Sequence, residues 1–290
     1  MHKTKDYLLD FEIIVSPERA KRPKQFKEEN DYEDLKLEIK NCPFCPGNES
    51  KTPGEYWRIE KNGQWIIRVF PNKFKIWKHH DIIVDSPDHL EDWDENKDLD
   101  LVIYSIKKRV KELLESKEIK YVQVFKNYGK DSGASLKHSH LQIIAFEFVP
   151  EQIERLSYKL NKCSCKICKK KWKNAKVLKE LKFFRVLALE GRFPYEIEIH
   201  NLEHKNFLTM KKEEIEELAN ILKRVIKRIK KYFNSYNVLF FIEPKEKDFH
   251  FFVRVFPRIN TWGGLELSSL LIVNTVKKED CYEFYKDLFD

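Results

Sequence analysis

The sequence predicts an α+β fold built from two similar units. Runs typical of strands and an amphipathic helix succeed one another in the order strand, strand, helix, strand, strand, and this order occurs twice. The 290 residues, 42% hydrophobic and 35% charged, suffice for two cores. Cys and His residues also recur in one order in both halves. We therefore expect a duplicated α+β unit with halves at residues 1–150 and 151–290, sheets able to join into one, and a connection near residues 150–180.

Eight stretches have the length of buried strands and are rich in β-branched and aromatic residues. Those of the first half are residues 65–70, 81–84, 121–126 and 140–148. Those of the second half are residues 183–189, 195–199, 236–242 and 250–256. A helix separates the second and third strands of each half. Apolar residues from Leu99 to Leu114 recur on one helical face, and residues 213–233 take the same place in the second half.

Composition limits the compartment and the class of partner. The chain carries 55 Lys and Arg against 47 Asp and Glu, a net charge of +8. Lysine tracts at residues 166–173 and 223–231 are able to hold phosphates or nucleic acid, but abundant Lys and Glu on helix faces more often serves solvation. The N-terminus lacks an apolar core of about 7 to 15 residues behind a basic start, and no run of about 18 apolar residues occurs. We expect a cytoplasmic protein that does not span a membrane, and we favour a partner other than nucleic acid.

Five of the six cysteines fall in two tight clusters, which indicates metal binding in a chain without an export signal. Two Cys separated by two residues can bind one ion from a single turn, and two His from distant strands complete a tetrahedron that suits zinc. Four protein ligands leave no open position, so we expect two structural zinc ions. The predicted ligands are Cys42, Cys45, His89 and His138 in the first half, and Cys165, Cys168, His204 and His250 in the second.

The remaining cysteines leave alternatives open. Cys163 is a possible substitute for Cys165 at the second ion. The second cluster could instead form a zinc ribbon that touches nucleic acid, but a ribbon needs a second Cys pair nearby and none occurs after Cys168. Cys281 stands alone before a final aromatic helix, and we expect it to serve packing.

The densest chemistry lies in the segment NYGKDSGASLKHSHLQII, residues 127–144. Its glycine and small residues allow backbone N–H groups to approach a phosphate. His138 and His140 are two apart and share one face of a strand, so one can bind metal while the other is presented to substrate, and Gln142 continues the row. Imidazole is a competent nucleophile toward phosphorus, and the Gln142 amide and the Ser135 hydroxyl can bind the phosphoryl oxygens. A satisfied buried His pair is the alternative, but the neighbouring loop and Gln142 favour catalysis.

Eight motifs extend this interpretation over nearly the whole chain. They are VSPERAKRP (15–23), CPFCPGNE (42–49), TPGEYWRI (52–59), RVFPNKF (68–74), SPDH (86–89), NYGKDSGASLKHSHLQ (127–142), FPYEIEI (193–199) and FPRINTWGGLEL (256–267). On these motifs the chain resembles the galactose-1-phosphate uridylyltransferase family of the histidine-triad superfamily. The resemblance implies duplicated histidine-triad-like units, each an antiparallel sheet with helices packed on it. It also implies a ping-pong nucleotide transfer through His140.

The resemblance also assigns roles to single residues. Gln142 and Ser135 match the residues that hold the transferred phosphoryl group. Asn127, Gly133 and Ala134 match the family's phosphate loop. Arg19 and Arg22 match basic residues that face phosphate, and Asn72 and Lys73 match the nucleotide pocket. Glu266 matches an acidic residue that contacts sugar hydroxyls, often from the neighbouring subunit, so a homodimer is implied. Independently, two Arg three apart are able to fork onto phosphate oxygens.

The chain departs from the family pattern at two places. Ser139 replaces the usual Pro between the two histidines, which should change loop stiffness more than chemistry. Phe252 occupies the second-half position that corresponds to His140, so that half should be catalytically silent. The second Cys-based site resembles that of two-zinc members such as the ADP-glucose phosphorylases.

Four functions are compatible with these patterns. The first is a hexose-1-phosphate nucleotidyltransferase of galactose metabolism, which converts UDP-glucose and galactose 1-phosphate to glucose 1-phosphate and UDP-galactose. The second transfers AMP from ADP-glucose to phosphate. A histidine-triad hydrolase is a third, although the second half and the segment 261–266 would then serve no purpose. From another class, the chain could be a zinc-stabilised nucleic-acid-binding protein with aromatic residues available for stacking.

Overall fold

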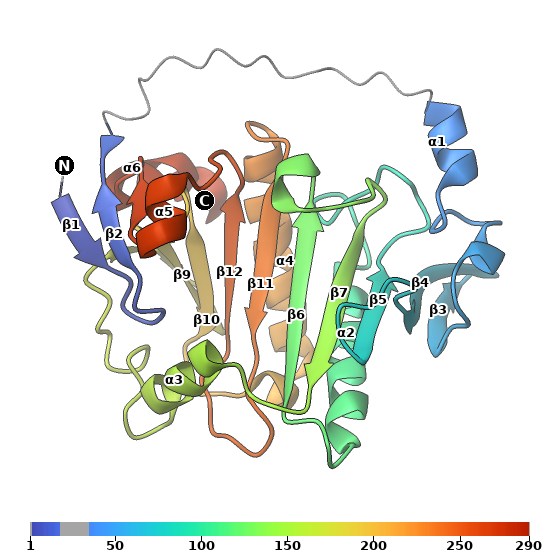
Figure 1. Cartoon of the computed structure of the whole chain (residues 1–290), viewed down its shortest axis with the longest axis horizontal. Helices are drawn as coiled ribbons and strands as arrows, with labels where there is room; N and C mark the ends of the chain where they lie inside the picture. Colours follow the sequence, from blue (N-terminus) through green and yellow to red (C-terminus); the bar gives the residue numbers. More distant parts are fainter. Residues whose placement is uncertain (1, 18–34, 290) are drawn as a thin grey trace.

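The computed structural model describes residues 2–17 and 35–289 and is built around one antiparallel sheet of ten strands (Figure 1). Across the sheet the strands are β3 (Trp57–Lys61), β4 (Gln64–Pro71), β5 (His79–Val84), β7 (His140–Phe146), β6 (Tyr121–Tyr128), β11 (Tyr236–Phe241), β12 (Phe252–Pro257), β10 (Ile197–Asn201), β9 (Phe184–Leu189) and β8 (Ala175–Glu180). The eight predicted strands are all present, with ends shifted by a few residues.

The order of the strands shows the duplication directly. Read outward from the centre, the first half runs β6, β7, β5, β4, β3 and the second half runs β11, β12, β10, β9, β8. Each strand of one half thus has a counterpart in the other. The halves join where β6 pairs with β11, from Tyr128 opposite Tyr236 to Val124 opposite Phe240. The predicted fold class, an α+β fold of duplicated units whose sheets join, is confirmed.

One helix of each half packs on the same face of the sheet (Figure 1). These are α2 (Leu99–Glu115) and α4 (Lys212–Lys230), the two predicted helices, and they also contact each other. Their apolar faces, including Val102 and Ile106 of α2 and Leu218 and Leu222 of α4, belong to a single buried cluster that includes strand residues of both halves. Burial at roughly 25 cal/mol per Å² makes this shared core the main stabilising contribution.

Several smaller elements lie outside the predicted pattern. A three-stranded sheet joins β1 (His2–Lys5), β2 (Glu12–Val15) and β13 (Ile272–Asn274), and the connection between the halves contains α3 (Glu151–Leu160). Short helices are α1 (Leu35–Asn41), α5 (Gly264–Ser269) and α6 (Lys278–Tyr285). Cys281 lies inside α6, where it is fully buried, as expected for a packing residue. None of the helices described is long and apolar enough to cross a membrane.

Candidate functional site

The first cluster of predicted metal ligands comes together beside β7. Cys42 and Cys45 lie in the loop after α1, His89 in the loop after β5, and His138 just before β7. One potential ligand atom from each lies within 4.8 Å of all the others. The nearest approaches are 3.2 Å from Cys45 Sγ to His89 Nδ1 and 3.4 Å from Cys45 Sγ to His138 Nδ1. All four residues are buried, so a bound ion would be shielded from water.

The second cluster repeats this arrangement in the other half. Cys165, Cys168, His204 and His250 also place their ligand atoms within 4.8 Å of one another. The Nδ1 atom of His250 lies 3.3 Å from both sulfur atoms. Cys165, and not Cys163, joins Cys168 in this cluster. Cys163 is exposed outside it. Because two His complete the set, this cluster has the ligands of a Cys2His2 site and not of a ribbon with two Cys pairs.

Each ligand histidine points Nδ1 at the sulfur atoms and Nε2 at an oxygen. His138 and His250 direct Nε2 at backbone carbonyls, Ser86 O at 2.8 Å and Asn201 O at 2.9 Å. The Nε2 atom of His204 lies 2.8 Å from Asp248 Oδ1, and that of His89 lies 3.4 Å from Glu38 Oε1. For His138, His250 and His204 these hydrogen bonds place the proton on Nε2 and leave Nδ1 free for a metal.

The protonation of the buried cysteines indicates whether the clusters suit a metal ion. Burial and the neighbouring Cys42 raise the pKa of Cys45 to about 12, and burial raises the pKa of Cys165 to about 12. Without a cation these thiols keep their protons at neutral pH, whereas metal binding displaces the protons and pairs the thiolates with charge. The donor set of two thiolates and two imidazoles is the one that zinc prefers. Both clusters therefore fit zinc sites.

His140 opens β7 and is 5% exposed. Its Nδ1 lies 2.9 Å from the backbone oxygen of His138, so Nδ1 carries the proton and Nε2 is left with its lone pair. Within the described chain no hydrogen bond engages Nε2. Burial lowers the pKa of His140 to about 4, which keeps the imidazole neutral at physiological pH. A neutral imidazole with a fixed tautomer is the form that can act as a nucleophile.

Gln142 lies beyond His140 on the same side of β7, and a residue that the sequence analysis missed fixes its orientation. The His80 Nδ1 atom accepts a hydrogen bond from the backbone N–H of Ile76, so Nε2 carries the proton and donates to Gln142 Oε1 at 2.8 Å. A phosphoryl oxygen only accepts hydrogen bonds, so the Gln142 NH2 group is the part of this side chain that can bind it. Asn72 also contacts the His80 ring, with Nδ2 3.2 Å from Nε2. His80 thus links the expected phosphoryl contact to the expected nucleotide pocket.

The glycine loop between β6 and β7 is held by the other half of the chain. Asn127 Nδ2 contacts Gly133 O at 3.5 Å, and Asn237 of β11 donates to Asn127 Oδ1 at 2.7 Å. Arg258, just after β12, donates to Asn237 Oδ1 at 3.1 Å. Gly129 has φ of +79°, and a Cβ there would overlap the carbonyl oxygen of Asn234. Only glycine fits this turn.

A cavity of about 340 Å³ opens beside this loop. Its lining includes His89, Tyr128, Gly129, Ala134, Ser135 and Asn234. Ser135 is exposed on the loop, and Ala134 is partly buried next to it. Ala134 and Ser135, two of the residues expected to hold phosphate, therefore line open space together with His89 of the first metal cluster.

Ser139 points into a buried charged cluster instead of stiffening the loop as Pro would. The Lys126 ammonium, wholly buried in β6, contacts the Ser139 hydroxyl and lies 3.1 Å from Asp85 Oδ2 and 3.3 Å from Asp92 Oδ1. Ser139 Oγ also donates to Asp92 at 3.1 Å. The residue between the two histidines is thus fixed by an ion pair on the side of the strand opposite His140.

Of the remaining predicted residues, Lys73 and Glu266 have no contact with this place within the described residues. Arg19 and Arg22 lie outside the described residues. Lys73 is exposed after β4. The Glu266 carboxylate accepts a hydrogen bond at 2.9 Å from the backbone N–H of Gly263 at the start of α5, and no contact joins it to His140 within the described parts of the chain. Arg19, Arg22, Lys73 and Glu266 therefore stay four expected substrate contacts.

The corresponding place in the second half holds no nucleophile. Phe252 comes two residues after His250, as His140 comes two after His138, and Arg254 takes the position of Gln142. The Arg254 guanidinium is fully buried and donates to Asp6, Glu196 and Glu198. The N-terminal segment supplies Asp6 and packs Tyr7 over this surface, where its hydroxyl contacts Glu198. The predicted silent half is thus packed and charge-paired where the first half has His140.

Comparisons with known proteins agree with this geometry. The chain is 28% identical to ADP-glucose phosphorylase of Arabidopsis thaliana, over 98% of this chain and 92% of the relative. A crystal structure of an Arabidopsis thaliana ADP-glucose phosphorylase with bound ADP-glucose superposes with a TM-score of 0.85 at 25% identity, covering 99% of this chain and 98% of the other. The chain is homologous to the galactose-1-phosphate uridylyltransferase and ADP-glucose phosphorylase family. It is therefore a nucleotidyltransferase of the histidine-triad superfamily.

Two further comparisons describe the breadth of this relationship. Galactose-1-phosphate uridylyltransferase of Thermotoga maritima is 32% identical over 59% of this chain and 61% of its own length. Residues 27–149 also match a domain of unknown function, the DUF4931 N-terminal domain. The two Cys2His2 clusters fit two zinc sites.

Proposed function

We propose that this nucleotidyltransferase works by two displacements at phosphorus, with a nucleotidyl group carried on His140 Nε2 between them. The observation that carries the proposal is the buried, neutral His140, whose Nδ1 proton is held by the His138 carbonyl. In the first step the Nε2 lone pair attacks the α-phosphorus of a nucleotide sugar. The bond to the bridging oxygen breaks, and sugar 1-phosphate leaves with that oxygen and its electron pair.

In the second step an acceptor oxygen attacks the same phosphorus and the P–N bond breaks. The electron pair returns to Nε2, so the histidine is regenerated in its starting tautomer. Gln142 is suited to hold the transferred group through both steps, because its carbonyl is already engaged by His80 and its NH2 group is left to donate. Ser135 and the N–H groups near Gly133 and Ala134 would contact the other phosphoryl oxygens.

For the reaction itself we favour AMP transfer from ADP-glucose to phosphate. The ADP-glucose phosphorylase relative aligns over 98% of this chain, and the matching structure contains bound ADP-glucose. The sequence expectation of UMP exchange between UDP-glucose and galactose 1-phosphate stays as the second candidate. It is supported by the higher identity, 32%, to a uridylyltransferase over a shorter alignment.

The two clusters would hold one zinc ion each through the eight residues already named, and closed coordination would supply cross-links and not an attacking group. Cys42 and Cys45 would tie the loop after α1 to His138 and hence to the start of β7. We also propose residues 1–150 as the catalytic half and residues 151–290 as the silent half.

A homodimer belongs to the same proposal. Glu266, in exposed α5, would then reach the sugar in the partner's site, and Arg19, Arg22, Asn72 and Lys73 would contact phosphate and nucleotide. Exposed Leu265, Leu267 and Leu270 around α5 are consistent with a covered surface.

Phosphorus NMR of the zinc-loaded protein tests the reaction in two parallel mixtures. One contains ADP-glucose with inorganic phosphate, and the other contains UDP-glucose with galactose 1-phosphate. ADP and glucose 1-phosphate in the first mixture, with the second unchanged, are expected. UDP-galactose in the second mixture would favour uridylyl exchange instead, and no turnover in either mixture would contradict both reactions.

A further inference from the structure

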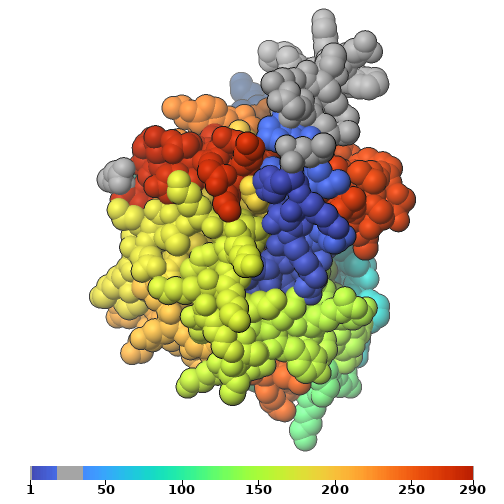
Figure 2. Space-filling view, turned by 90° about the vertical axis from the view of Figure 1, so that its left-hand side faces the viewer, coloured from blue at the N-terminus to red at the C-terminus, as the bar shows by residue number. Residues whose placement is uncertain are grey.

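A second, strongly basic cavity lies between the N-terminal segment and the loop after Cys168. Its volume is about 650 Å³. It is lined by Lys5, Asp6, Tyr7, Asp10, Lys166, Lys170, Lys171, Trp172 and Lys173. Figure 2 shows the N-terminal segment in dark blue beside the yellow-green segment that carries residues 160–175. None of the proposed active-site residues contributes to its wall.

The charge in this cavity is not balanced by its own carboxylates. Asp6 is buried and bound to Arg254, with 3.2 Å from Nη2 to Oδ1. Asp10 is already paired with Lys159 and lies 3.3 Å from Lys5. In contrast, three lysines are exposed and form no ion pair within the described parts of the chain: Lys170, Lys171 and Lys173. Several positive charges close together favour a ligand with several negative charges.

The lysines stand on a loop whose backbone is fixed. Lys170 N–H donates to Ile167 O at 3.0 Å, and Lys171 N–H donates to Lys166 O at 3.1 Å. Trp172 forms a rigid wall, because its ring lies 5.6 Å from the His200 ring and 6.4 Å from the Tyr7 ring, centroid to centroid. A loop whose backbone is held loses less conformational entropy on binding than the same residues on a mobile chain.

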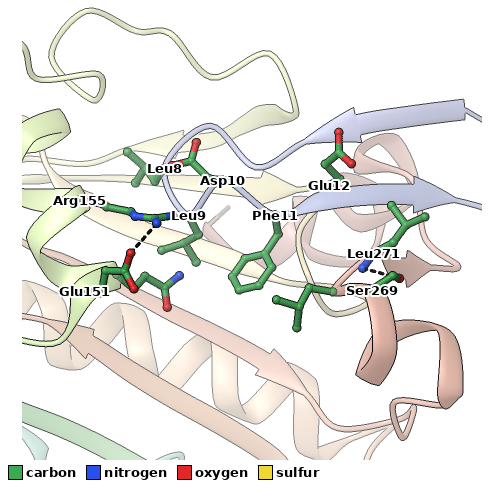
Figure 3. Close-up of a pocket in the computed structure, with 11 residues that line it drawn as sticks. Leu8, Leu9, Asp10, Phe11, Glu12, Glu151, Arg155, Ser269 and Leu271 are labelled. Carbon is green, nitrogen blue, oxygen red and sulfur yellow. Dashed lines mark hydrogen bonds and ion pairs between the residues drawn. The ribbon is translucent and has the colours of Figure 1, made fainter.

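A neighbouring cavity shows that the basic lining is a local property. It lies beside the turn between β1 and β2, where Asp10 lines both cavities, and it has a volume of about 340 Å³ (Figure 3). Its wall is apolar and acidic, with Phe11, Glu12 and Glu151, and its one arginine, Arg155, lies 2.5 Å from the Glu151 carboxylate. The charge of this lining does not favour the binding of an anion. The lysines are gathered on one side only.

We propose that the basic cavity binds a small ligand with a di- or triphosphate group, at a site separate from the one around His140. The Lys170, Lys171 and Lys173 ammonium groups would contact the phosphate oxygens, and Lys5 and Lys166 would add to the positive field. Two sources share this chemistry: a free nucleoside diphosphate or triphosphate, and inorganic polyphosphate. A nucleotide would additionally place its base near Trp172. This site does not depend on the reaction proposed for His140.

Calorimetric titration of the full zinc-loaded chain tests the site, with ATP in one arm and inorganic tripolyphosphate in the other. The test variant carries Lys170→Glu, Lys171→Glu and Lys173→Glu. A matched control carries Lys97→Glu, Lys111→Glu and Lys117→Glu, three exposed lysines outside the cavity with the same change in charge. We expect a binding event that weakens at least tenfold in the test variant and less than twofold in the control, while binding at the His140 site remains.

The two arms separate the sources of the phosphate. ATP binding at least tenfold tighter than tripolyphosphate would identify a nucleotide, and equal binding would identify the phosphate chain alone. Wild-type binding by the test variant would overturn the proposal, as would an equal loss in both variants. Tight binding of a single-stranded oligonucleotide with neither small ligand bound would overturn it in favour of a nucleic-acid surface. Circular dichroism melting of both variants shows that each remains folded.

Discussion

The two halves of the sheet carry the same metal cluster but use the adjacent strand in opposite ways. In the first half the strand after the ligand histidine presents His140 and Gln142, opposite Val84 and Ile82 of β5. In the second half the same positions hold Phe252 and Arg254, opposite His200 and Glu198 of β10. One place keeps a neutral imidazole whose Nε2 atom no described residue engages, and the other is closed by an aromatic ring and a buried ion cluster.

This comparison indicates that the metal cluster and the reactive residue are separable parts of the unit. A closed Cys2His2 site can stabilise either half, because its four ligands leave no position for substrate. In the function proposed above, the chemistry depends on the side chain two residues after the ligand histidine. The second half has Phe252 at that position, and it also supplies Asn237 and Arg258 to the loop of the first half.

The largest effect should come from His140→Asn. Removal of the nucleophile should lower nucleotide transfer on the order of 10³-fold or more, because no second imidazole takes its place. Zinc content by mass spectrometry and the melting temperature should stay unchanged. The matched control is Phe252→Leu at the equivalent position, which should keep turnover within about twofold and lose roughly 1 kcal/mol of stability. Equal activity losses in the two variants would mean that the halves do not differ as described.

Cys42→Ser and Cys165→Ser should each remove one zinc ion but differ in activity. Both should melt lower by on the order of 10 °C, as expected for a loss of several kcal/mol in a chain of this size. Only Cys42→Ser should also lower turnover strongly, since His138 holds the Nδ1 proton of His140. Elemental analysis and steady-state rates below the melting transition check both parts. Comparable activity in the two variants would mean that the first metal cluster does not support catalysis more than the second does.

Arg254→Met should destabilise the second half by about 3 to 5 kcal/mol, because it leaves buried carboxylates without their cation. Lys126→Met should also destabilise the first half, because it leaves Asp85 without a cation and Asp92 with Lys230 alone. Of the two, only Lys126→Met should reduce turnover of the folded protein, through Ser139 and the histidines beside it. Urea unfolding measures the stability, and single-turnover rates measure the chemistry. A larger rate loss in Arg254→Met than in Lys126→Met would contradict the proposal that the first half is the catalytic one.

Lowering the pH should have the smallest effect near neutrality. Since burial lowers the pKa of His140 to about 4, the single-turnover release of sugar 1-phosphate should stay nearly constant from pH 7 to 5 and fall below about pH 4.5. Stability should decline over the same direction, because between about pH 6.5 and 4 the unfolded chain binds a proton at this residue that the folded chain does not. Circular dichroism at each pH shows whether a loss of rate accompanies unfolding or occurs in the folded protein. A rate decline centred near pH 6.5 would indicate an ordinary, exposed imidazole.

Sequence patterns predicted the parts of this molecule that are local or repeated. The Cys pairs separated by two residues and the recurring His positions predicted both clusters, and helical periodicity predicted α2 and α4. The edge strands β3 and β8 were missed because they are half exposed and lack a clean buried run. The small sheet of β1, β2 and β13 pairs the two ends of the chain, which no local pattern indicates.

Contacts between distant side chains explain the rest of what the sequence did not reveal. His80 stands in no motif, and only the pairing of β5 with β7 brings it to Gln142. Asn237 and Arg258 reach the glycine loop because β11 pairs with β6. Lys126 is one more lysine in a basic chain until folding buries it between two aspartates. The predictions for Arg19 and Arg22 concern residues outside the described ranges.

Rapid-quench labelling with ADP-glucose carrying ³²P in the α-phosphate tests the central claim most directly. Without an acceptor, the wild-type protein should release one glucose 1-phosphate per chain and retain one label, which peptide mapping should place on His140. Added phosphate should then discharge the label as ADP. No retained label in a protein that turns over, or a label that persists in His140→Asn, would contradict a nucleotidyl intermediate on this histidine.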